Sequence, residues 1–166
     1  MNTTKNEIKM DEDGTDKHWK AVSTMESALT VSQRAAICFA AGVIGAGAVV
    51  LFSHVLFQSA LSATLGVKAP VSLKSPDIYK PLFWGGLWGM LFGLFINTAW
   101  NRLYLVGFLY VLAPLLALFL FFLPKSGAGY FGLSRGATFT VYLLLVNLPF
   151  GIITALVARA IIGTHL

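Results

Sequence analysis

Four long apolar runs, none containing an acidic residue, dominate the pattern of hydrophobic and polar positions along the chain. They are Ala35–Phe57, Pro81–Ala99, Leu103–Leu123 and Ala137–Ala158. Each run is close to the ~20 residues that a helix needs to cross the ~30 Å hydrocarbon core of a bilayer. Unsatisfied backbone groups are costly in lipid, and the runs lack period-2 alternation, so we expect helices rather than barrel strands. The pattern predicts an all-α fold, a polytopic transmembrane four-helix bundle.

Polar and charged residues fill positions 1–22, which we interpret as a disordered tail because they include too few apolar side chains to bury a core. The transmembrane domain then occupies residues 23–166. A capping box, Ser23-Thr24-Met25-Glu26, predicts a helix start ahead of the first span. Helix-compatible residues continue past that span to Leu65, and Gly66 is the first plausible stop.

Composition agrees with a chain whose main solvent is lipid. The sequence is 57% hydrophobic and only 11% charged, with a net charge of +5, whereas soluble domains carry roughly 25% charged residues. Every acidic residue except Asp77 precedes residue 34, so the basic excess surrounds the spans and favours anionic lipid headgroups over nucleic acid. Asp77 is placed to cap the second helix. Lys5 and Lys9 in the tail favour cytoplasmic termini.

Small residues recur at four-residue spacing in three of the spans, including the first, where Ala41 precedes Gly45 and Gly42 precedes Ala46. Gly85, Gly89 and Gly93 share one stripe of the second span, and Gly151 and Ala155 share one stripe of the fourth. Such stripes let two helix backbones approach closely. This matters in lipid, where the hydrophobic effect between helices is weak and association depends on van der Waals packing. We expect helix–helix contacts there, with a partner helix from this chain or from another copy. We expect spans one, two and four to meet closely.

An aromatic stripe lies one residue earlier in the second span, at Trp84, Trp88 and Phe92. A ligand lying against this stripe is the alternative to pure helix packing. The third span has few small residues, so we expect it to be the most exposed to lipid.

Asn147 is the only side-chain amide placed deep in a span, near the midplane of the fourth helix. Pro114 should kink the third helix at a similar depth and free the carbonyl of Tyr110. We expect Asn147 to donate to that carbonyl, or to the carbonyl of Leu145 that Pro149 frees. A substrate-binding Asn147 is the alternative.

The remaining polar candidates are His54 and Asn97, which helix geometry spreads with Asn147 over different depths. No paired acids, metal-ligand spacing, nucleophile motif or phosphate loop accompanies them. We therefore expect no enzyme, no cofactor and no metal site, and we interpret the three residues only as a possible polar site.

The loop from Pro124 to Gly136 combines glycines with aromatic and basic side chains. Its Tyr130 and Phe131 are suited to the membrane interface, and Lys125 and Arg135 to lipid phosphates. A lipid-headgroup or partner contact is the functional interpretation, and a plain interfacial turn is the alternative.

Three segments, Pro81–Phe95, Lys125–Leu133 and Leu143–Arg159, give the chain a resemblance to small four-helix bacterial integral membrane proteins of unknown function. Those proteins carry a Trp-Gly-Gly-Leu-Trp-Gly span and a Lys-x-Gly-Ala-Gly loop, which resemble residues 84–89 and 125–129 here. The resemblance covers about residues 35–160. It implies location in the bacterial inner membrane and no particular activity.

The sequence thus favours an integral membrane accessory or assembly subunit that acts through helix packing, with the bilayer and other subunits or a second copy as partners. An oligomeric small-solute transporter or channel is the alternative.

Overall fold

The computed structural model describes residues 29–96 and 102–163, and within these the chain forms helices and no strand. The all-α class is therefore confirmed for the described part of the chain. The predicted tail 1–22, the capping box at 23–26 and Asn97 lie outside it. The elements are α2 (Val31–Gln58), α3 (Leu61–Thr64), α4 (Tyr79–Phe95), α5 (Leu103–Tyr110), α6 (Leu112–Ala117), the π-helix η2 (Leu118–Phe122), α7 (Leu123–Lys125), the 3₁₀-helix η3 (Tyr130–Arg135) and α8 (Ala137–Gly163).

Three helices in the described residues are long and apolar enough to cross a membrane: Val31–Gln58, Leu103–Lys125 and Ala137–Gly163. The second of these joins α5, α6, η2 and α7 end to end, and we call it the α5–α7 rod. Helix α4 has 17 residues, which at ~1.5 Å per residue gives about 26 Å, slightly less than the ~30 Å hydrocarbon core. By length and composition the three longer helices indicate a membrane protein.

Helix α2 has well-defined ends. Thr30 is its N-cap: the Thr30 hydroxyl accepts from the Gln33 amide, and the Gln33 side chain accepts from the Thr30 amide, which completes a capping box. At the other end the expected run to Leu65 is wrong. The helix stops at Gln58 because Ala60 adopts a left-handed conformation with φ 61°, and the short α3 follows as a separate turn.

Helix α4 begins without the predicted cap. Ile78 occupies the N-cap position and makes no side-chain capping bond. The Asp77 carboxylate instead lies 3.9 Å from the Lys80 ammonium group, in an exposed ion pair. Solvent-exposed pairs of this kind contribute little to stability, so the start of α4 is held by its packing on α2.

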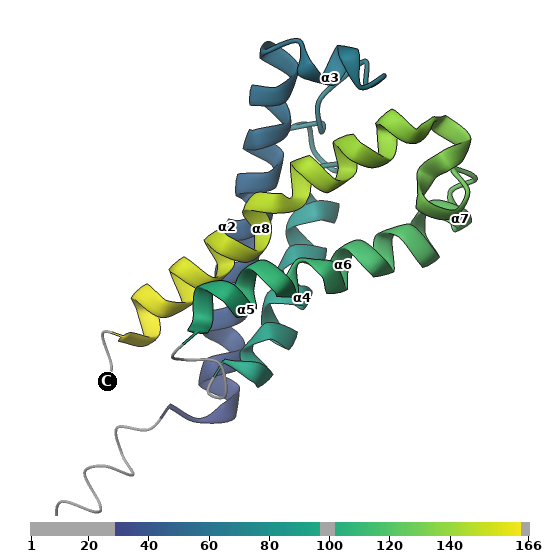
Figure 1. The fold of residues 1–166 in the computed structure, drawn as a ribbon. Helices are drawn as coiled ribbons and strands as arrows, with labels where there is room; N and C mark the ends of the chain where they lie inside the picture. The colour runs from purple at the N-terminus through teal and green to yellow at the C-terminus, as the bar shows by residue number, and fades with distance from the viewer. Residues whose placement is uncertain (1–28, 97–101, 164–166) are drawn as a thin grey trace, which may run out of the picture.

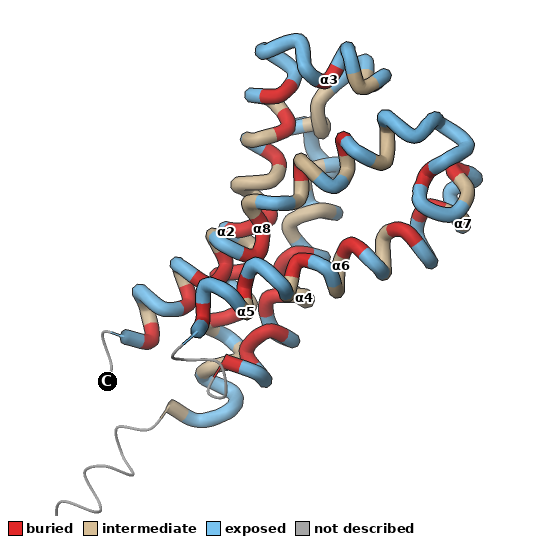
Figure 2. Tube along the Cα trace, in the orientation of Figure 1, coloured by how far each residue is buried: buried red, intermediate tan, exposed pale blue. Residues whose placement is uncertain are grey.

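Helix α2 is the central element of the fold (Figure 1). Helix α4 runs beside it, α8 crosses it at an angle, and the α5–α7 rod packs against α8 through α5. The buried positions gather where these helices meet (Figure 2). One core cluster combines all four helices: Cys38, Ala41, Phe92, Ile96, Leu103, Ala155, Ala158 and Ile162.

The α5–α7 rod is interrupted where the sequence placed a kink. Helix α5 ends at Tyr110 and α6 begins at Leu112, because Pro114 has no amide proton for the carbonyl of Tyr110. A further irregularity follows at η2, where the helix widens to a π-helical turn. These two departures interrupt the regular hydrogen-bond pattern of the rod.

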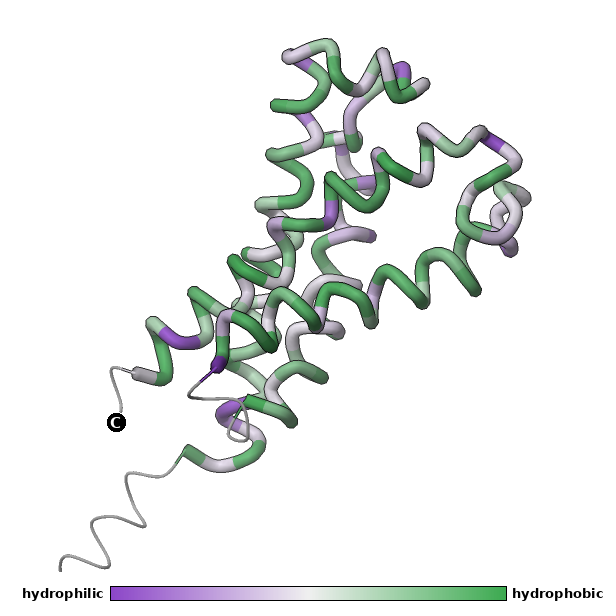
Figure 3. The backbone as a smooth tube through the Cα atoms, in the orientation of Figure 1, coloured by the Kyte–Doolittle hydropathy of each residue, from purple (hydrophilic) through white to green (hydrophobic). Residues whose placement is uncertain are grey.

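Hydrophobic residues predominate along the helices (Figure 3), and many of their large side chains are exposed. Phe121 is 71% exposed, Leu51 65% and Leu94 60%. The α5–α7 rod has a smaller buried share than the other two long helices, 22% against 33% and 39%. A helix that is apolar all round requires an apolar solvent, which agrees with lipid around these helices.

Candidate functional site

The glycine stripe of α4 lies against the backbone of α2 in the same chain. A β-carbon built on Gly89 would lie 2.6 Å from the Cα of Gly42, and one built on Gly85 would lie 2.9 Å from the carbonyl oxygen of Gly42. Gly93 faces Cys38, with 3.0 Å between the built β-carbon and the Cys38 Cβ. The approaches at Gly85 and Gly89 are closer than real β-carbons show, so glycine is required at these two positions, whereas the contact at Gly93 is tight.

The small residues of α8 make two further crossings. A β-carbon on Gly107 of α5 would lie 2.6 Å from the Cβ of Ala155 and 2.8 Å from the carbonyl oxygen of Gly151. On the other side of α8, a β-carbon on Gly45 of α2 would lie 3.0 Å from the carbonyl oxygen of Phe150 and would also meet the Thr154 hydroxyl. Gly107 is a packing residue that the sequence reasoning passed over, although its small size was the available signal.

The small-residue stripes therefore have partners within the chain. Helices α2 and α4 meet, and helices α2 and α8 meet, whereas α8 takes its second neighbour from the α5–α7 rod. Phe150 of α8 reaches α4 only through its ring, 3.4 Å from a β-carbon built on Gly85.

A cavity of about 290 Å³ lies where α2, α4, the middle of the α5–α7 rod and α8 face one another. Its walls include Val49, Trp84, Trp88, Pro114, Phe122 and Asn147. Two residues of the predicted aromatic stripe, Trp84 and Trp88, thus line it, whereas Phe92 is buried in the core. Beside the cavity the rod contacts α4: the Trp84 and Phe122 rings lie 5.0 Å apart, and the Tyr110 hydroxyl donates to the Trp88 carbonyl at 2.7 Å.

Asn147 contributes the side-chain amide of this cavity, and its hydrogen bond differs from the expected one. Its Nδ2 donates to the carbonyl oxygen of Leu143 at 2.8 Å, one turn earlier in α8, and not to the carbonyl of Tyr110 or Leu145. The Leu143 carbonyl is always within reach of a side chain four residues later. The second Nδ2 proton and the Oδ1 acceptor make no hydrogen bond within the described residues.

His54 lies outside the cavity, near the end of α2. Its Nδ1 lies 2.9 Å from the Val50 carbonyl oxygen, which can only accept, so Nδ1 carries the proton. The neighbouring Ser53 is fully buried; its hydroxyl donates to the same carbonyl and accepts from the amide of Val71 at 3.2 Å. Ser53 thereby fastens the connector after α3 to α2, a role that nothing in the sequence pattern indicated.

The polar candidates are thus not brought together. Asn147 lines the cavity, His54 bonds to its own helix, and Asn97 is outside the described residues. Residues 29–96 and 102–163 also contain no group of three His, Cys, Asp or Glu side chains that could hold a metal ion.

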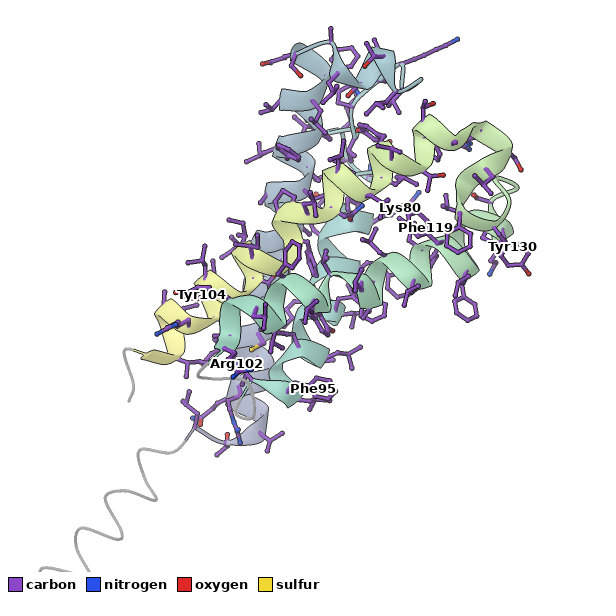
Figure 4. The ribbon with its side chains drawn as sticks, in the orientation of Figure 1. Lys80, Phe95, Arg102, Tyr104, Phe119 and Tyr130 are labelled. Carbon is purple, nitrogen blue, oxygen red and sulfur yellow. The ribbon has the colours of Figure 1, made fainter. Side chains whose placement is uncertain are left out.

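The loop after the α5–α7 rod is compact and presents one face outward. Tyr130 is 65% exposed at this end of the molecule, opposite Arg102 and Tyr104 (Figure 4). Phe131 is 41% exposed; its ring lies 5.5 Å from the Phe119 ring, and its carbonyl accepts from the Thr140 hydroxyl at 2.6 Å. Lys125 and Arg135 are exposed, and the Arg135 guanidinium lies 5.3 Å from the centre of the Phe139 ring.

No protein-family model, no curated protein and no solved structure matches this chain.

Proposed function

We propose that the chain is a four-span integral membrane protein of the bacterial inner membrane, with α4 as the span besides the three longer helices. The close packing of α4 along α2 supports this. A helix whose backbone packs against that of a spanning helix lies at the same depth in the bilayer. Its length of 17 residues lies within the range of about 17–25 that spanning helices adopt.

Its function, in this proposal, is that of an accessory or assembly subunit that works through helix packing rather than through catalysis. The observation that carries the proposal is the position of α4 at the edge of the fold. Its glycine side is covered by α2, while large side chains on its other sides face outward: Phe83, Met90, Leu91, Leu94 and Phe95. A second copy or a companion subunit would add contacts along a helix that has one backbone neighbour.

The polar side chains support the same function. Ser53 and His54 bond to the Val50 carbonyl, and the Asn147 amide bonds to the Leu143 carbonyl. Each of these bonds joins a side chain to a carbonyl of its own helix, so these polar atoms are engaged within the helices.

The test is the composition and native mass of the full chain purified from its own membrane in mild detergent. We expect companion proteins or a homo-oligomer, and we expect Leu94→Trp on the outer side of α4 to reduce the associated mass. Leu156→Trp, on the outward side of α8, is the matched control and should leave it unchanged. A monomer without companions, or equal effects of both substitutions, would contradict the proposal.

One observation favours the transporter alternative, namely that Asn147 lines a cavity between all of the long helices. Flux of small solutes into liposomes that contain the purified chain distinguishes the two functions. Flux that is lost in Asn147→Leu would support transport, and impermeable liposomes would support the subunit.

The loop between the α5–α7 rod and α8 is assigned, in this proposal, to lipid headgroups. Exposed Tyr130 would lie at the interface, and exposed Lys125 and Arg135 would lie near phosphates. Flotation with vesicles is uninformative for an embedded protein, so the test is lipid retention: Lys125→Gln with Arg135→Gln should reduce the anionic lipid that co-purifies with the chain.

A further inference from the structure

We propose that the cavity beside Asn147 is a binding site for a neutral, ring-bearing amphiphile that enters from the lipid. Such a molecule has an aromatic or quinoid ring with a hydroxyl or carbonyl group, and any apolar tail would remain among the lipid chains. The site is separate from the outer side of α4, so it does not rest on the subunit function proposed above.

The amide of Asn147 provides the polar recognition. One Nδ2 proton is engaged by the Leu143 carbonyl, which fixes the orientation of the amide. The other Nδ2 proton and Oδ1 remain as one donor and one acceptor at a wall of the cavity. A carbonyl or hydroxyl oxygen on the ligand can therefore bond to the amide, and the absence of water in the bilayer core makes such a bond selective.

The walls provide the apolar recognition. Trp84, Trp88 and Phe122 supply aromatic surface, and Val49, Pro114 and Leu118 complete the apolar part. Aromatic rings interact favourably with such side chains in offset-stacked or edge-to-face arrangements. A hydrophobic lining with a few placed polar groups is the usual composition of a small-molecule site.

The volume of the cavity indicates the size of the ring system that it can hold. An apolar cavity of about 150 Å³ is enough to hold benzene in a protein core, so about 290 Å³ accommodates two fused rings. Access is from the side: Trp84 is 46% exposed and Phe122 39% exposed, although both also line the cavity. The edge-to-face contact of their rings, with 5.0 Å between centres, lies at this mouth.

The test uses 2-naphthol as the probe and the full chain in detergent micelles, with equilibrium dialysis against micelles that lack protein. We expect saturable binding of about one molecule per chain. Naphthalene, which has the same rings without the hydroxyl, should bind roughly three- to fifteen-fold more weakly, the range for one hydrogen bond inside a membrane protein. Asn147→Leu should abolish the difference between the two probes.

A matched pair of substitutions on α2 tests the location. Val49→Phe fills the cavity and should remove 2-naphthol binding, whereas Val55→Phe places the same ring on the lipid-facing side, where Val55 is 56% exposed, and should leave it intact. Continued protection of Cys38 from a maleimide verifies that each variant is folded.

Three results would overturn the proposal. If 2-naphthol and naphthalene bind equally to the unmodified chain, the amide has no role in recognition, whatever the variants do. If Val49→Phe lowers binding and Asn147→Leu does not, the cavity holds an apolar lipid chain. If neither substitution changes binding, the probe occupies another place.

Discussion

Gly42 of α2 and Gly89 of α4 lie backbone against backbone. A β-carbon built on Gly42 would stand 2.7 Å from the Cα of Gly89, and one built on Gly89 would stand 2.6 Å from the Cα of Gly42. Neither neighbour can yield by rotating a side chain, because both are main-chain atoms. This crossing therefore fixes the distance between the two helices, and with it the position of the aromatic wall of the cavity.

Gly89→Ala is expected to destabilise the protein by about 1–3 kcal/mol, the usual effect of forcing extra volume into a packed contact. Gly47→Ala is the control, because its built β-carbon is 4.0 Å from Leu82 and alanine raises helix propensity. The measurement is thermal unfolding, monitored through maleimide labelling of Cys38. This residue is the single cysteine of the chain and is fully buried.

The sequence alone allowed the glycine stripe to be a contact with another copy. If Gly89→Ala or Gly89→Leu left the unfolding temperature unchanged and reduced the native mass, an intermolecular contact would be correct and the α2–α4 crossing would be wrong.

Gly45→Ala is expected to destabilise the crossing of α2 and α8, since the new methyl group would meet the Thr154 hydroxyl and lie 3.0 Å from the Phe150 carbonyl oxygen. Thr154 is buried, and its hydroxyl has no hydrogen-bond partner within the described residues. Thr154→Ala should therefore be nearly neutral alone and should partly rescue Gly45→Ala. Unfolding temperatures of both single variants and the double variant give the coupling energy. Strict additivity would argue against contact between the two positions.

Tyr110→Phe removes the hydroxyl that donates to the Trp88 carbonyl at 2.7 Å, while the ring contact with Phe92 at 5.0 Å remains. We expect a loss of about 0.6–1.7 kcal/mol, as for other hydrogen bonds between membrane helices. Tyr104→Phe is the control, because Tyr104 is exposed and meets Arg159 through its ring. Urea- or heat-induced unfolding in detergent measures both, and equal stabilities would show that the bond to α4 carries no energy.

Gly132→Ala tests the fold of the loop after the α5–α7 rod. Gly132 has φ +75°, and a β-carbon there would lie 3.0 Å from the Phe139 ring; Gly127 has φ +78° with nothing within 4 Å. Both substitutions incur the left-handed penalty of about 1–2 kcal/mol, and only Gly132→Ala adds a steric clash. We therefore expect a lower melting temperature for Gly132→Ala than for Gly127→Ala. The reverse order would mean that this loop does not pack on α8 as described.

The helices follow from the apolar runs, because lipid cannot satisfy backbone polar groups and a long apolar segment has to satisfy its own. The run expected from Ala137 begins a helix at that residue, and the run expected over Ala35–Phe57 becomes Val31–Gln58. The break near Pro114 was also predictable, since proline removes a local donor whatever surrounds it.

Local chemistry was less decisive where several partners competed. The carbonyls of Tyr110, Leu145 and Leu143 were candidate acceptors for the Asn147 amide. The bond forms to Leu143, whose carbonyl the helix already holds one turn before Asn147. The end of α2 was similarly missed, because neither Ser59 nor Ala60 is a residue type that ordinarily ends a helix. The left-handed conformation at Ala60 precedes a connector whose Val71 amide donates back to Ser53 of α2.

Which small-residue stripes face one another depends on how the helices pack in the tertiary structure. Gly89 could have met any small-residue surface, and its pairing with Gly42 depends on the angles and offsets of helices that are far apart in sequence. The cavity beside Asn147 is of the same kind. Spacing along a helix places a residue on a face, but the space between faces arises only when four helices from different parts of the chain are packed together.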